Sequence, residues 1–166
     1  MSPRWKRFRS GPGDTLVVSL AVEEMALLED LPAQLRDVLE GPADDPATKR
    51  LFPKAYLDPT EEEAESEYEA LVQPDLLRQR LDAIDLVTAS FTRAVAAGEW
   101  REVALAPDEV AAWLGVLNDL RLTLGTRLGV TEEERTIAPD DPNLLAFTIY
   151  DWLTSLQGEL IDQLLR

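Results

Sequence analysis

The sequence predicts a mostly α-helical fold (α+β), in which a bundle of about five to six helices carries a small antiparallel sheet of two to three strands. Apolar residues recur at three- and four-residue steps through most of the chain, which is typical of amphipathic helices. The β-prone runs lie in the first 20 residues and at residues 102–105. With 166 residues and 45% hydrophobic content, the chain is long enough to bury one core. We therefore expect a single domain over residues 1–166.

The first 20 residues are expected to form a β-hairpin with a basic arm, followed by a helical body over residues 21–166. Aromatic and basic residues alternate over residues 5–9, and residues 15–20 form a β-prone run. The segment Gly11-Pro12-Gly13-Asp14 between them is typical of a turn.

The helical body is divided by prolines and glycines, which mark helix boundaries. The first helix is expected from Val22 to Gly41, with a kink or a break at Pro32. The later helices follow from the same spacing: a helical turn within residues 43–59, an acidic helix start after Thr60, a long helix from Pro74 to Gly98, one from Pro107 to Gly129, a short one from Thr131, and a terminal one from Pro142.

Residues 18–26 align without gaps with residues 103–111. Each segment is a β-prone run that leads into a helix with acidic residues in its first turn. We expect the two strands to pair in one sheet. Internal duplication and chance similarity of two strand-to-helix junctions both explain the alignment.

The chain contains no cysteine and no histidine. This absence excludes disulfides, thiol nucleophiles, thiol redox sensing, cysteine- or histidine-based zinc sites and histidine-dependent catalytic triads. The glycines lack the spacing of a nucleotide-binding loop, and the acidic clusters lack the spacing of an EF-hand. We therefore predict a protein that is not an enzyme, with no cofactor and no catalytic or metal-binding residues.

The formal net charge is −16, but the basic residues Arg4, Lys6, Arg7 and Arg9 cluster at the start. Residues 14–166 carry a charge of −20, because all 32 acidic residues but only 12 of the 16 basic residues lie there. Such a body repels nucleic acid, so we predict at most a weak DNA contact through the basic arm. A basic protein surface is the more natural partner. No apolar run is long enough to cross a membrane, and we expect a cytoplasmic location.

The segment over residues 117–129 is the densest candidate for a functional surface. Asn118, Arg121 and Gly125 share a helix face near Arg127, and the glycine permits close approach of another segment. Three interpretations stay open: an internal clamp in which arginine pairs with a carboxylate such as Asp151 or Asp85, a partner-binding face, and a ligand pocket. We predict Asn118, Arg121 and Arg127 as interaction residues.

This segment, the N-terminal hairpin, the Asp45-Pro46 loop and residues 147–153 resemble the actinobacterial AosR-type oxidative-stress regulators, long described as a domain of unknown function. The resemblance covers nearly the whole chain. It implies a transcriptional regulator that cooperates with a stress sigma factor to induce an alternative cysteine-synthesis cluster, in some members through a redox-active cysteine pair. Without cysteine this chain cannot form that disulfide switch. Genes of the family tend to neighbour a protease adaptor.

We therefore predict a noncatalytic regulatory protein that contacts a sigma factor or RNA polymerase through exposed acidic helix surface. The alternative is an adaptor or structural interaction domain in proteolysis. That alternative forms a homodimer through the apolar stripe of the terminal helix or through the small strands. A third hypothesis, a ligand binder, requires a pocket lined by Trp113, Asn118 and Arg121.

Overall fold

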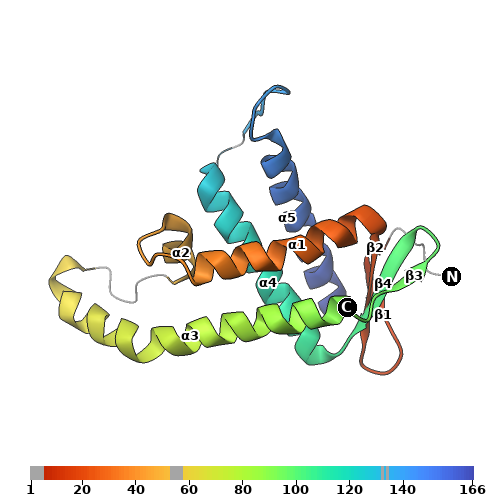
Figure 1. Cartoon of the computed structure of the whole chain (residues 1–166), viewed down its shortest axis with the longest axis horizontal. Coiled ribbons are helices and arrows are strands. Elements are labelled where there is room, and N and C mark those ends of the chain that lie inside the picture. The colour runs from red at the N-terminus through yellow and green to blue at the C-terminus, as the bar shows by residue number, and fades with distance from the viewer. Residues whose placement is uncertain (1–5, 53–57, 132, 134) are drawn as a thin grey trace.

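The computed structural model describes residues 6–52, 58–131, 133 and 135–166. It confirms a mostly α-helical fold with a small sheet (Figure 1). The elements in chain order are β1 (Phe8–Ser10), β2 (Leu16–Ala21), α1 (Val22–Leu39), α2 (Pro46–Leu51), the 3₁₀ turn η1 (Pro59–Glu61), α3 (Glu62–Phe91), β3 (Val95–Ala97), β4 (Trp100–Leu105), α4 (Pro107–Leu128) and α5 (Leu144–Leu164).

The sheet has four antiparallel strands in the order β1-β2-β4-β3, one more than the largest sheet predicted. The additional strand is β3, in a segment that the sequence assigned to the long helix ending at Gly98. The helix instead ends at Phe91, and the chain turns back at Gly98, whose φ of 65° is a conformation that glycine adopts without strain. The predicted pairing of the two β-to-helix junctions is confirmed by the β2–β4 ladder.

The internal similarity has a structural counterpart in two ββα units, β1-β2-α1 and β3-β4-α4. Val18 and Val103, which are equivalent in the alignment, are direct partners in the β2–β4 ladder. The four strands are therefore arranged symmetrically about the centre of the sheet. Both helices also begin alike: Glu24 accepts a hydrogen bond from the Ala21 N–H at 3.2 Å, and Glu109 accepts one from the Ala106 N–H at 3.1 Å.

Two prolines predicted to interrupt or begin helices lie inside continuous ones. Pro32 lies within α1, and Pro74 lies within α3, so the acidic segment and the long helix predicted separately are one helix of 30 residues. Buried side chains on both sides of Pro32 hold α1 together despite the missing backbone donor. In Figure 1, α3 changes direction between its yellow and green parts, as expected for a helix that contains proline.

The short helix predicted from Thr131 is absent from the described residues between Gly129 and Leu144. Glu134, which was expected to close its capping box, lies outside the described residues. The terminal helix begins at Leu144 rather than at Pro142.

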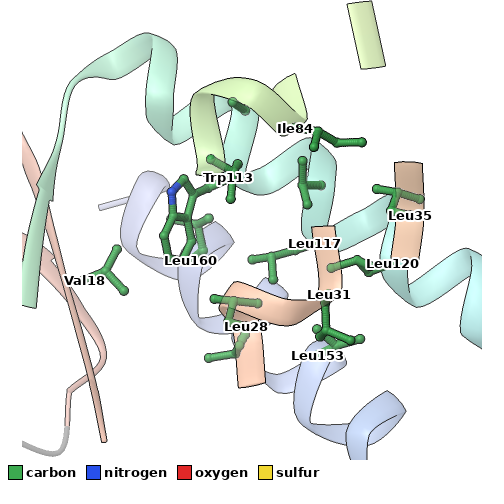
Figure 2. Packing of buried hydrophobic residues seen from close by; sticks show 14 of the residues in the cluster. Val18, Leu28, Leu31, Leu35, Ile84, Trp113, Leu117, Leu120, Leu153 and Leu160 are labelled. Carbon is green, nitrogen blue, oxygen red and sulfur yellow. The ribbon is translucent and has the colours of Figure 1, made fainter. Parts of the chain in front are cut away.

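The core surrounds α4, which packs against α1, α2, α3 and α5. Trp113 is its largest fully buried side chain, and Figure 2 shows it among leucines from α1, α4 and α5. Its indole Nε1–H donates to the Ser90 hydroxyl at 2.9 Å, so this buried polar group is satisfied. The Phe91 ring lies 5.5 Å from the Trp113 ring, centroid to centroid. Among the described helices, none combines the length and the apolar character needed to cross a membrane.

Candidate functional site

Arg7, one of the predicted interaction residues, ties the start of β1 to two helices. Its guanidinium donates to Glu24 of α1 at 2.9 Å and to both carboxylate oxygens of Glu159 of α5 at 3.2 Å. Glu24 also accepts a hydrogen bond from Trp152 Nε1 at 2.7 Å. Burial by itself raises the pKa of Glu24, but the hydrogen bonds from Arg7, Trp152 and the Ala21 N–H together hold that pKa below its ordinary value.

The other residues of the basic arm have different surroundings. Arg9 pairs with Glu102 of β4 at 3.0 Å, whereas Lys6 lines a pocket of about 240 Å³ together with Glu159 and Arg166. Arg4 lies outside the described residues. Two of the four basic residues predicted to meet a partner, Arg7 and Arg9, are thus engaged in ion pairs within the fold.

The predicted face of α4 is divided between internal contacts and solvent. Asn118 Oδ1 accepts a hydrogen bond from Gln157 Nε2 of α5 at 3.1 Å, so Asn118 joins two helices. Arg127 is exposed and forms no ion pair within the described part of the chain. The pocket that Arg121 lines within the described residues includes neither Asn118 nor Trp113, which is buried in the core.

The internal clamp exists, but with other residues than those predicted. Asp151 and Asp85, the carboxylates expected to pair with α4, instead pair with Arg135 and Arg36. The buried carboxylate is Asp119, and its partner is Arg80 of α3. The sequence analysis missed Asp119, although an acidic residue on the buried side of an apolar helix requires a cation and could have indicated it.

Arg121 lines a polar pocket of about 250 Å³ between α2, α4, α5 and the segment that follows α4. We name it the Arg50–Arg121 pocket. Its lining consists of Arg50, Arg121, Leu122, Gly125, Thr126, Val130, Thr131 and Tyr150.

Gly125 lets α4 approach the Tyr150 ring of α5 closely at the wall of the pocket. A Cβ atom at this position would lie 2.9 Å from Cε2 of Tyr150, which is closer than two carbon atoms normally approach. The predicted close approach at Gly125 is therefore present, and an aromatic ring makes it. The guanidinium of Arg135 lies 5.1 Å from the centroid of the same ring, within the range of a cation–π contact.

The described lining of this pocket is rich in hydrogen-bond donors. Its described lining contains two arginines and three hydroxyl groups but neither a carboxylate nor a histidine, the groups that most often act as general bases. Across the described part of the chain, no three acidic residues gather into a group that could hold a metal ion.

Comparison with known proteins places this architecture in a family. The family model for a domain of unknown function, DUF2017, matches residues 2–164. The oxidative stress regulators AosR of Mycobacterium tuberculosis (strain ATCC 25618 / H37Rv) and Mycobacterium bovis are each 28% identical to the chain over 188 aligned positions. These alignments cover 95% of this chain and 86% of each relative.

A Mycobacterium leprae protein that also bears the AosR name is 26% identical, with the same coverage. No solved structure matches the chain. The match over nearly all of the sequence confirms the AosR-like resemblance, and the chain belongs to the DUF2017 family.

Proposed function

We propose that the protein is a noncatalytic regulator that acts by contacting a protein of the transcription apparatus, such as a stress sigma factor or RNA polymerase. The observation that carries this proposal is the relationship to proteins named oxidative stress regulator, which extends over 95% of the chain. Because the alignment extends over nearly the whole chain, a role shared with those relatives would involve the whole fold. The absence of cysteine means that a trigger other than a disulfide must control it.

The contact surface we propose is the acidic α3 surface, formed by Glu61, Glu62, Glu63, Glu67 and Leu71. The four glutamates are exposed and form no ion pair within the described residues, and Leu71 is 77% exposed among them. In Figure 1 this yellow end of α3 projects away from the sheet and the core. A projecting helix with unpaired carboxylates and one apolar side chain fits a basic protein surface that has an apolar recess.

The basic arm has a smaller role in this proposal than its composition indicated. Arg7 and Arg9 hold β1 to α1, α5 and β4, so reversing their charge would disturb the fold as well as any contact with DNA. A direct test of DNA contact therefore changes only Arg4 and Lys6. If replacing both residues with glutamate leaves assembly on promoter DNA unchanged, the arm does not contact DNA.

The test of the proposal is affinity purification of the tagged full-length protein from its native host, before and after oxidative stress, with mass spectrometry. We expect recovery of a sigma factor or RNA polymerase subunits with the wild type. The E62K/E63K/E67K variant should lose them. The matched control E29K/D30K/D37K makes the same change in charge on exposed residues of α1 and should retain them. Equal capture by both variants would exclude the acidic α3 surface.

A second candidate is an adaptor or homodimeric interaction domain in proteolysis. Leu145 and Leu165, near the two ends of α5, are 72% and 81% exposed, which favours an apolar contact. The middle of the predicted stripe is unavailable, because Leu153, Leu156 and Leu160 are buried in the core. Light scattering at several concentrations separates a dimer from a monomer, and recovery of protease components alone would favour this candidate.

A further inference from the structure

We propose that the Arg50–Arg121 pocket binds a small phosphate-type oxyanion, either free phosphate or the phosphoryl group of a small molecule. This inference goes beyond the proposed function and does not depend on it, because the pocket lies on α2, α4 and α5, and the acidic α3 surface takes no part in it. The two ideas can therefore fail separately.

The first argument is the charge of the lining. The chain has twice as many acidic as basic residues, yet the described lining of this pocket contains two arginines and no carboxylate. Seven of the other described arginines have a carboxylate partner: Arg7, Arg9, Arg36, Arg78, Arg80, Arg93 and Arg135. Arg101, Arg127 and Arg166 have none among the described residues. Two guanidinium groups on one small cavity repel each other unless an anion lies between them.

The second argument is that Arg121 has no partner for its guanidinium. Its Nε atom is shielded from solvent and makes no hydrogen bond. The Nε atoms of Arg7, Arg80 and Arg101 are also shielded and without a hydrogen bond. The terminal nitrogens of Arg7 and Arg80 bind carboxylates, however, and a terminal nitrogen of Arg101 donates to the Ala94 carbonyl at 3.3 Å. Arg121 forms no hydrogen bond or ion pair of this kind within the described residues. The shielded Nε–H of Arg121 therefore lacks an acceptor among the described residues, and a bound anion would supply one.

The third argument concerns the hydroxyl groups. Thr126 is occupied, because its hydroxyl donates to the Leu122 carbonyl at 2.8 Å. The Thr131 hydroxyl accepts a hydrogen bond from the Glu133 N–H at 3.3 Å, which leaves its own proton free to donate. The Tyr150 hydroxyl has no hydrogen-bond partner within the described chain, so it is a second free donor. Free donors therefore come from α2, α4, α5 and the segment after α4.

This arrangement selects the class of anion. A tetrahedral phosphate presents four oxygens to donors on several sides, whereas a carboxylate presents two oxygens in one plane. The cavity volume of about 250 Å³ suits a small ligand or a single phosphoryl group rather than a length of polymer. The charge of −20 on residues 14–166 also repels polyanions such as nucleic acids, which supports a compact ligand.

The test is titration of the full-length ¹⁵N-labelled protein with inorganic phosphate, at an ionic strength held constant with chloride, followed by NMR chemical shifts. We expect saturable shifts at residues 121–131 and at Tyr150. Arg50→Gln and Arg121→Gln should each raise the Kd by about tenfold or more, because each removes charge-assisted hydrogen bonds. Arg50 is exposed, so R50Q should fold even if R121Q does not.

Arg127→Gln is the matched control, because Arg127 lies on the same helix, is exposed and does not line the pocket. It makes the same change in net charge and should leave the Kd unchanged. Tyr150→Phe keeps the ring and removes the hydroxyl donor, and it should weaken binding. Absence of saturable shifts, equal weakening by R127Q and R121Q, or acetate binding as tightly as phosphate would each overturn the proposal.

Discussion

The carboxylate of Asp119 in α4 accepts a hydrogen bond from the guanidinium of Arg80 in α3. The second terminal nitrogen of Arg80 donates to the backbone carbonyl of Leu51 in α2 at 3.0 Å, so one arginine connects three helices. The Asp119 side chain is only 7% exposed. Burial raises the pKa of Asp119, and the hydrogen bond and charge of Arg80 offset only part of that rise.

Removing one member of this pair should be more harmful than removing both. Asp119→Asn leaves the Arg80 guanidinium without its counter-charge, and we expect the free energy of unfolding to fall by about 2–4 kcal/mol. The double variant R80M/D119L replaces both charges with apolar side chains and should recover most of that loss. Urea denaturation followed by circular dichroism measures both variants, and a double variant as unstable as D119N or less stable would contradict the expectation.

Glu24 should make stability depend on pH in the acid range. Its folded pKa is lower than its ordinary value of 4.5, so the stabilisation by the Arg7 and Trp152 contacts is present above pH 4.5. It is lost as the pH falls through the folded pKa. Glu24→Gln should therefore lower the free energy of unfolding at pH 7 by about 1 kcal/mol, and the difference from the wild type should vanish in acid.

The matched control for this pH dependence is Glu23→Gln, which changes the exposed neighbour in the same helical turn. It should leave the stability curve close to that of the wild type. The comparison requires urea titrations at several pH values, and a difference between E24Q and the wild type that persists unchanged at low pH would argue against an ionic role for Glu24.

Substituting alanine at two glycines of α4 should change the free energy of unfolding in opposite directions. Gly125→Ala places a Cβ atom 2.9 Å from the Tyr150 ring, so the ring must move, and we expect a loss of about 1–3 kcal/mol. Gly115→Ala meets nothing within 4 Å on an exposed helix face and should gain about 0.5–1 kcal/mol. Thermal unfolding of the two variants measures the contrast, and similar shifts of Tm in the same direction would show that Tyr150 does not pack against Gly125.

Ser90 should contribute to the stability of the fold because its hydroxyl accepts the hydrogen bond of the buried Trp113 indole N–H. Its hydroxyl accepts from Trp113 Nε1 and donates to the Val87 carbonyl at 2.6 Å. Ser90→Ala leaves the buried indole N–H without an acceptor and should cost about 1–3 kcal/mol. Thr88→Ala, an exposed change on the same helix, is the control and should be nearly neutral. Equal stability of the two variants in urea would mean that the indole finds another acceptor.

The sequence alone predicted the helices and the pairing of β2 with β4, because both depend on local periodicity and on an alignment within the chain. The resemblance to the AosR-like family also came from contiguous segments. Prediction failed where the local signals were ambiguous. Pro74 is compatible with a helix start and with a bend inside a longer helix, so the start of α3 was placed wrongly. The alanines of β3 continue a helical pattern, so this strand was assigned to the preceding helix.

Only the tertiary structure decided the partners of the charged residues. Arg80 and Asp119 are 39 positions apart, and Arg7 and Glu159 are 152 apart, so no local pattern connects them. In a chain with 32 carboxylates, the sequence offers each arginine many alternatives of similar energy, and packing of the helices selects one. For the same reason, only the fold could show that Arg50 and Arg121 line one pocket whose described lining holds no carboxylate.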